Sequence, residues 1–141
     1  MNDHFHIREL TEVETSILLE SLITSWEVTN NYWYPLKPVE KSDVIAFNAD
    51  EFENRFGFHR LREILKDNLE IYEIREWKNA GRQINPKTFE PQYDGEGEGY
   101  WFPKDMKWIV YCSHENSITF GGEEIIQLIK KNWNDWFQYT W

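Results

Sequence analysis

Cysteine, long apolar runs and basic residues are all scarce in this chain of 141 residues. A single cysteine cannot form an internal disulfide, and it excludes a zinc site built from several thiolates. No apolar run approaches the roughly 18 residues that a membrane span requires. The first six residues lack the basic and apolar stretches of a signal peptide, so we expect a cytoplasmic protein.

The shortage of bases leaves the chain strongly acidic, with 25 acids against 15 bases and a formal net charge of −10. Residues 1–54 hold eleven acids and three bases, whereas residues 55–141 hold fourteen and twelve. Such a surface repels nucleic acid and anionic membranes. It favours a basic protein partner, because the field speeds encounter and fixes orientation. The alternative is that the acidity only keeps the protein soluble.

Aromatic residues are abundant, at 17% of the chain. Disordered chains are poor in aromatics, so this composition indicates a folded protein. The length predicts one globular domain over residues 1–141, large enough to bury a single hydrophobic core.

The first predicted element is a helix from about Thr11 to Trp26. Thr11 and Glu14 have the spacing of a capping box, in which each side chain satisfies a free main-chain N–H of the other. Apolar residues then recur at helical spacing and predict one buried face: Leu18, Leu19, Leu22, Ile23 and Trp26.

The middle of the chain predicts a short strand at 44–47 and a helical region from Asp50, where Glu53 completes a second capping-box spacing. This region ends near Lys66 and is interrupted near Gly57. A strand follows at 69–77, and residues 79–104 form the longest irregular segment. Loops of that length are often functional.

The C-terminal half predicts a β-hairpin, with strands at 107–113 and 117–120 joined by a tight turn. A last helix is expected at 123–137. The order of elements favours an α+β domain with a mainly antiparallel sheet and about three covering helices.

Alternating acids and glycines stand inside the long irregular segment. Asp94, Glu96 and Glu98 do not have the spacing of an EF-hand, and no phosphate-loop Lys-Ser/Thr pair follows the glycines. Tyr100 and Trp101 come directly after. Aromatic anchors beside charges are typical of interface hot spots, so we expect partner contact here. A plain solvated loop and a metal loop are the alternatives.

Ser113, His114 and Glu115 are residue types found in hydrolases, and they fall at the hairpin turn. Adjacent residues do not form a triad by adjacency alone, and no Gly-x-Ser-x-Gly elbow exists. We expect them to fix the turn by hydrogen bonds, with partner contact by His114 and Glu115 as the functional alternative. We expect Cys112 to be a core residue rather than a nucleophile.

Histidines and tryptophans near the two ends offer weaker candidates. His4 and His6 make an incomplete metal site, so we expect no metal and no cofactor. Trp133 and Trp136 are expected in the core, whereas Trp141 is open to an interface role.

The segment from Trp108 to Gly122 combines an aromatic strand, Ser-His-Glu, a polar turn, and Ile-Thr-Phe followed by glycine. It resembles a pattern in small acidic bacterial proteins, the immunity proteins of toxin systems that include contact-dependent inhibition. The resemblance implies a non-enzymatic protein that binds and blocks one cognate toxin.

These observations predict an inhibitor that occludes a basic active-site surface through Asp94, Glu96, Glu98, Tyr100 and Trp101, with His114 and Glu115 next. A competing contact surface lies in the acidic first third, around Glu12, Glu14 and Glu20. The alternative function is a small hydrolase-like enzyme with a histidine–carboxylate site at His114 and Glu115. A third hypothesis is an oligomer joined by its Trp-rich tail, although we favour a monomer.

Overall fold

Helices and strands alternate along the chain in a computed structural model that describes residues 6–28 and 32–141. The elements in chain order are β1 (His6–Glu9), α1 (Glu12–Trp26), β2 (Val44–Asn48), α2 (Ala49–Glu51), the π-helical turn η1 (Phe52–Phe56), α3 (Phe58–Ile64), β3 (Ile71–Arg75), β4 (Arg82–Ile84), β5 (Gly99–Phe102), β6 (Ile109–Cys112), β7 (Ser117–Gly121), α4 (Glu123–Lys131) and the 3₁₀ turn η2 (Trp136–Tyr139).

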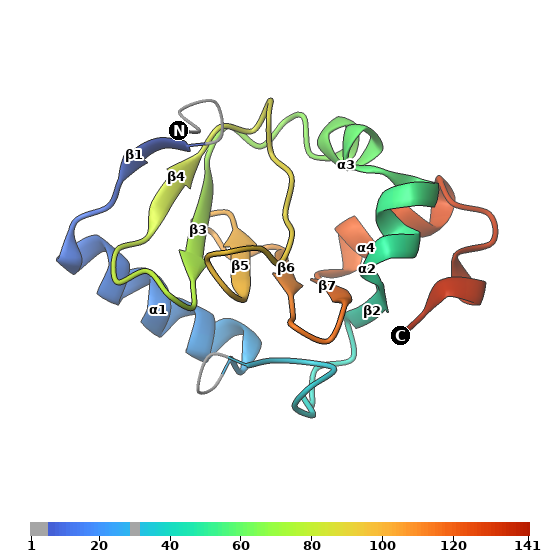
Figure 1. Cartoon of the computed structure of the whole chain (residues 1–141), viewed down its shortest axis with the longest axis horizontal. Coiled ribbons are helices and arrows are strands. Elements are labelled where there is room, and N and C mark those ends of the chain that lie inside the picture. The colour runs from blue at the N-terminus through green and yellow to red at the C-terminus, as the bar shows by residue number, and fades with distance from the viewer. Residues whose placement is uncertain (1–5, 29–31) are drawn as a thin grey trace.

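One antiparallel sheet organises the described residues, with its seven strands in the order β1-β4-β3-β5-β6-β7-β2. Helix α1 lies by the β1-β4-β3 part, whereas α2, α3 and α4 gather by β7 and β2 (Figure 1). The α+β class with a mainly antiparallel sheet is therefore confirmed. Within the described ranges, no helix is long and apolar enough to cross a membrane.

Two hydrophobic cores lie on opposite faces of this sheet, because side chains alternate along each strand. On β3, Tyr72 and Ile74 pack with α1, whereas Ile71 packs in the other core. On β5, Tyr100 faces α1 and Trp101 faces the opposite side. Because both faces of the sheet are covered, the aromatic side chains of β5 lie in the cores and not at the surface.

Helix α1 begins with the predicted capping box. Thr11 accepts a hydrogen bond from the Glu14 N–H at 3.1 Å, and Glu14 accepts one from the Thr11 N–H at 2.8 Å. The hydrogen bond from Arg8 is the first cause of the pKa of Glu14 falling to about 2. The predicted apolar face is only partly correct, since Leu19 and Ile23 are exposed to solvent.

The helical region after β2 begins differently from the prediction. Asn48, not Asp50, caps it by accepting the N–H of Glu51 at 3.0 Å. Gly57 interrupts the region as expected, with a φ of 91° that ends the π-helical turn and precedes α3. Side chains of Phe52 and Phe56 from this turn are buried in the core.

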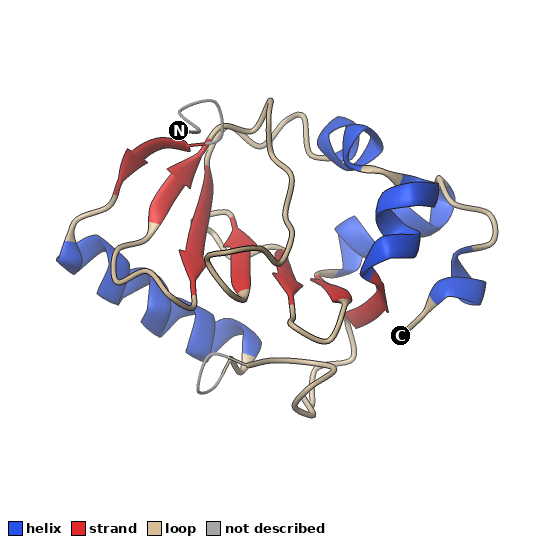
Figure 2. Cartoon of the chain, viewed as in Figure 1, coloured by secondary structure: helices blue, strands red, loops and turns tan. Residues whose placement is uncertain are grey.

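The segment 79–104 is not a long loop, because it contributes β4 and β5 to the centre of the sheet. Both strands are short, and their charged residues and glycine interrupt the apolar pattern from which a strand is predicted. What remains between them is the 85–98 loop, which Figure 2 shows descending over the middle of the sheet.

The predicted hairpin is present, with Cys112 opposite Ile118 across β6 and β7. Ser113 fixes the turn as expected, since its hydroxyl accepts the Glu115 N–H at 3.1 Å. The last helix ends at Lys131 rather than near 137, and a 3₁₀ turn follows. Trp133 is buried as predicted, whereas Trp136 is only partly buried against the core.

Candidate functional site

On the face of the sheet opposite α1, strands β3, β4 and β5 carry charged side chains. Helix α4 contacts β7 and β2 at the other end of the sheet. The 85–98 loop covers β3, β4 and β5 instead, and a cavity of about 660 Å³ lies between loop and strands. We call this cavity the charged cleft.

A row of three side chains crosses the charged cleft. Glu73 lies directly opposite Arg82 on β4 and Trp101 on β5 in the sheet register. Its carboxylate lies 2.6 Å from Nη2 of Arg82 and accepts a 2.9 Å hydrogen bond from Nε1 of Trp101. Directly opposed residues have side chains on the same face of a sheet. Strand pairing therefore sets this row.

Arg75 lies two residues beyond Glu73 on the same face of β3 and ties the loop to the sheet. Its side chain is 3% exposed. Nη2 of Arg75 donates to Asp94 Oδ1 at 2.6 Å and to the Gly97 carbonyl at 2.8 Å. Gly99 makes room for this arrangement, since a Cβ there would lie 2.4 Å from the Trp101 ring and 2.9 Å from Nε of Arg75.

Glu96 joins the same network from the loop. It accepts a hydrogen bond from Arg82 and lies 3.6 Å from Arg75 and 3.6 Å from Lys78. Burial alone would raise its pKa, but the three bases outweigh burial and hold the pKa of Glu96 below its ordinary value. The cleft therefore pairs three acids with three bases: Glu73, Asp94, Glu96, Arg75, Lys78 and Arg82.

The predicted contact residues in this segment need correction on two counts. Glu98, Tyr100 and Trp101 are buried, at 0%, 4% and 2% exposure, so they are not surface anchors. Asp94 and Glu96 reach the surface, but their charges are already neutralised by bases of the same chain. The acidic loop is thus fixed against the sheet rather than offered as a free anionic surface.

Glu98 forms a second site on the other side of the sheet with His114. The buried carboxylate accepts hydrogen bonds from the Tyr111 hydroxyl, from the main-chain N–H of His114 at 3.0 Å, and from the His114 ring at Nδ1. The ring is 44% exposed, and its Nε2 lies 3.3 Å from the Glu115 carboxylate. The hydrogen bond to Glu98 raises the pKa of His114 above its ordinary value.

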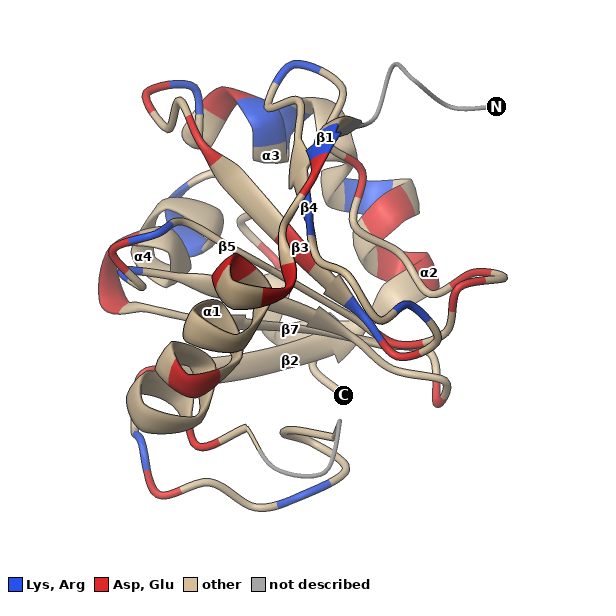
Figure 3. Ribbon diagram, turned by 90° about the vertical axis from the view of Figure 1, so that its left-hand side faces the viewer, with Lys and Arg blue, Asp and Glu red and all other residues tan. Residues whose placement is uncertain are grey.

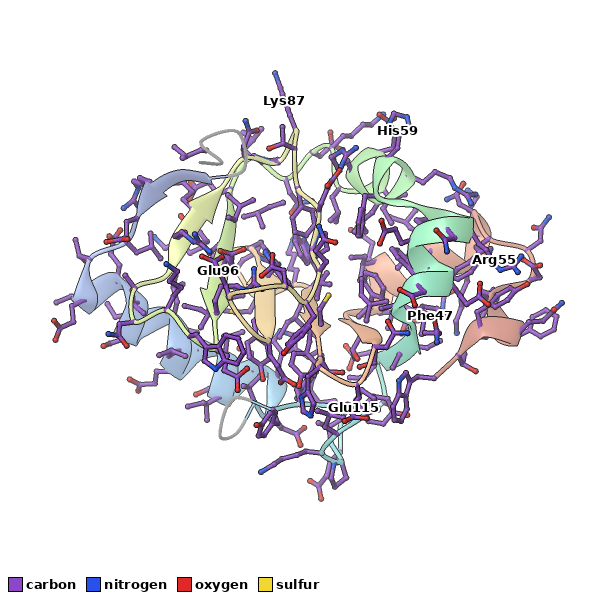
Figure 4. All side chains as sticks on the ribbon, in the orientation of Figure 1. Phe47, Arg55, His59, Lys87, Glu96 and Glu115 are labelled. Carbon is purple, nitrogen blue, oxygen red and sulfur yellow. The ribbon has the colours of Figure 1, made fainter. Side chains whose placement is uncertain are left out.

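This geometry gives His114 a defined ring orientation. The carboxylate on Nδ1 directs Nε2 away from Glu98 and towards the exposed Glu115, so the ring lies between two acids. His114 and Glu115 border an open hollow of about 530 Å³ together with Tyr32, Lys37 and Trp141. Figure 4 shows Glu115 well separated from Glu96, so the predicted site residues form two sites rather than one.

The neighbouring hydroxyl and thiol do not complete a nucleophilic site. The Ser113 hydroxyl is buried and lies 2.5 Å from that of Ser117. Cys112 is buried in the core, as expected, and burial raises the pKa of its thiol. A raised pKa removes the thiolate that a nucleophilic cysteine needs.

The acidic loop and the pair His4 and His6 are the candidate metal sites in the sequence. Across residues 6–28 and 32–141, no three His, Cys, Asp or Glu side chains are placed to hold a metal ion. His4 lies outside the described residues, and nothing is described of the His6 side chain.

Sequence reasoning missed the bases of the charged cleft. Glu73 and Arg75 stand two apart in a predicted strand, so they share a face, and this spacing was the available signal. Arg82 gives no such signal, because β4 is too short to show a strand pattern in the sequence.

In comparisons with family models, curated proteins and solved structures, no family, protein or structure matches this chain significantly.

Proposed function

We propose that this protein is a non-enzymatic inhibitor, of the immunity-protein kind, that binds a basic protein and blocks its active surface. The partner class that fits best is a toxin domain with a basic, nucleic-acid-binding active site. We expect the inhibitor to act in the cytoplasm as a monomer.

The observation that carries this proposal is the unbalanced charge of the first third of the chain. Ten acidic side chains between residues 6 and 54 are described, and only Glu14 and Glu51 form ion pairs with a Lys or Arg. In the charged cleft, by contrast, Asp94, Glu96 and Glu73 are all paired. Residues 55–141 hold fourteen acids and twelve bases, so most of the net negative charge available to a partner comes from the first third.

Uncompensated carboxylates favour a basic partner in two ways. They accelerate association with it by long-range attraction, and they suppress binding to anionic competitors. An inhibitor of a nuclease gains from this chemistry, because its carboxylates take the positions of the phosphates that the nuclease would bind. We therefore propose that the contact lies around Glu12 and Glu20, as in the competing prediction, and not at the loop.

Co-purification from the native cell tests the function. We expect a basic protein to remain bound at low salt, to dissociate as salt rises, and to lose its own activity when the inhibitor is added. A partner of acidic pI, or a basic partner whose activity is unchanged, would contradict the proposal.

A second candidate function is an enzyme that uses His114 as a general base. The observation that favours it is the contact of Nδ1 with the fully buried Glu98. Turnover in a hydrolase panel that His114→Gln abolishes, with the variant still folded at the assay temperature, would support it. Absence of turnover, or turnover that survives His114→Gln, would contradict it.

A further inference from the structure

Helix α1 is apolar on the side that faces solvent as well as on the side that faces the sheet. Leu18, Leu22 and Trp26 are buried in the core beneath it. On the outside, four apolar side chains are exposed: Val13 at 68%, Ile17 at 60%, Ile23 at 54% and Leu19 at 37%. A helix of a globular protein ordinarily carries polar residues on its outer face.

These four side chains form two apolar rows on the exposed side of the helix. Val13 and Ile17 are four residues apart, and so are Leu19 and Ile23, so each pair stacks along the helix axis. At 3.6 residues per turn the two rows lie about 120° apart around the axis, and Ser16 and Glu20 occupy the strip between them. Single exposed apolar residues are common, but two such rows on one exposed side of a helix favour an interaction surface. We call the two rows and the strip between them the outer face of α1.

The charges around the outer face are all of one sign within α1. The helix contains Glu12, Glu14 and Glu20 and no Lys, Arg or His. Arg8 neutralises Glu14 at 2.9 Å, which leaves Glu12 and Glu20 without an ion pair in the described chain. Figure 3 shows acidic bands and no basic band along α1.

The C-terminal end of α1 adds an acid where helix electrostatics disfavour one. Glu27 is the C-cap residue, with a φ of 62°, and no base stands in the last turn. The negative end of the helix dipole repels a carboxylate. Glu27 Oε1 accepts the N–H of Glu40, which places a second acid nearby. Lys41, over the Trp26 ring at 5.0 Å, is the base close to this end.

We propose that the outer face of α1 is the docking surface for the basic partner. The occupant is a protein segment whose apolar side chains cover the two rows, Val13 with Ile17 and Leu19 with Ile23, and whose Lys or Arg side chains reach Glu20 between the rows and Glu12 at the start of the helix. This assignment rests on the proposed inhibitor function and names the surface that performs it.

Charge decides against the other occupants of an apolar helix face. A second copy of this chain would bring a second set of unpaired carboxylates against Glu12 and Glu20, on a molecule of net charge −10. An anionic membrane surface is repelled for the same reason. A basic protein segment alone satisfies both the apolar rows and the acids beside and between them.

Two synthetic peptides provide a defined probe. Both are amphipathic helices of about 16 residues with the same Leu and Ile face, one with Lys and Arg on its rim and the other with Glu. Titration into the ¹⁵N-labelled full-length protein reports where each binds. We expect the basic peptide to shift the amide signals of residues 12–26 and to bind about tenfold or more tightly than the acidic peptide.

Matched variants separate the outer face from the rest of the surface. The double substitution Ile17→Ala with Ile23→Ala removes apolar contact area, so binding should weaken about tenfold or more. It should leave the melting temperature unchanged or raised, because both side chains are exposed and alanine favours a helix. Leu69→Ala with Phe137→Ala changes two side chains that are more exposed and lie outside α1, so this variant should bind as the wild type.

Charge variants test the acids of the outer face in the same way. Glu20→Lys should weaken binding of the basic peptide several-fold, with a smaller effect at high salt. Glu53→Lys changes the net charge equally, but it lies on the turn η1, so it should have a much smaller effect.

Any one of five outcomes would overturn the assignment. The peptides could bind with equal affinity, or the shifted signals could lie outside α1. Light scattering could instead show a dimer that Ile17→Ala with Ile23→Ala dissociates, or phosphatidylcholine vesicles could protect α1 from exchange. A captured basic partner that binds these variants with wild-type affinity would refute the surface and leave the proposed function standing.

Discussion

The His114 ring and the Glu98 carboxylate form a contact in which one partner is half-exposed and the other has no exposed surface. Glu98 immediately precedes β5, and His114 follows β6, so the pairing of these strands brings them together. The same carboxylate accepts the His114 main-chain N–H at 3.0 Å. Both the turn and the ring therefore depend on one buried acid.

Stability should depend on pH through His114. Its pKa is raised above 6.5, first by the hydrogen bond to Glu98, so the contact stabilises the folded state in full below pH 6.5. This contribution is lost as pH rises through the raised pKa. Urea unfolding of wild type and His114→Gln from pH 5 to 9 measures it. An unchanging difference between the two proteins across that range would contradict the prediction.

Replacing Glu98 by glutamine should destabilise the fold by about 1–3 kcal/mol, because an amide has one acceptor oxygen for the donors of Tyr111 and His114. The pKa of His114, followed by NMR, should fall towards 6.5. Glu115→Gln is the matched control, since Glu115 is 55% exposed and its loss should cost less than about 0.5 kcal/mol. Equal losses from both substitutions would argue against a special role for Glu98.

Arg75→Met should be among the most destabilising single substitutions, at about 3–5 kcal/mol, because it leaves Asp94, Glu73 and Glu96 short of a buried base. Lys78→Met removes the same charge from a side chain that is 51% exposed, so it should cost less than about 1 kcal/mol. Chemical denaturation compares the two. A loss below about 1 kcal/mol for Arg75→Met would mean that the fold tolerates the loop carboxylates without their buried base.

Gly99, the first residue of β5, and Gly95, in the 85–98 loop, should respond differently to alanine. A Cβ at Gly99 would overlap the Trp101 ring at 2.4 Å, so Gly99→Ala should cost about 1–3 kcal/mol or more. At Gly95 nothing lies within 4 Å, so Gly95→Ala should stay within about 0.5 kcal/mol of the wild type. Thermal unfolding distinguishes them, and similar melting temperatures for the two variants would contradict the described packing.

Much of the fold was predictable from local patterns. The capping box of Thr11 and Glu14 located the start of α1, and the continuous apolar run before Cys112 located β6. Both signals act within a few residues, so no knowledge of the rest of the fold is needed to interpret them. β4 was missed because three residues beginning with Arg82 carry too little hydrophobic pattern.

The candidate sites were less predictable, because their partners are distant in sequence. Asp94 and Glu96 were expected to face a partner, yet Arg75 and Arg82 neutralise them across the sheet. His114 was paired with its neighbour Glu115 in sequence, whereas its buried partner is Glu98.

The sequence alone determined the acidity, the concentration of uncompensated acids in residues 1–54, and the helical period of α1. Tertiary structure decided which side of that helix faces the sheet. Leu18, Leu22 and Trp26 are buried there, whereas Leu19 and Ile23 stay in solvent. Periodicity cannot choose between two apolar faces of one helix. The sheet covers only one of them, and the other stays exposed to solvent.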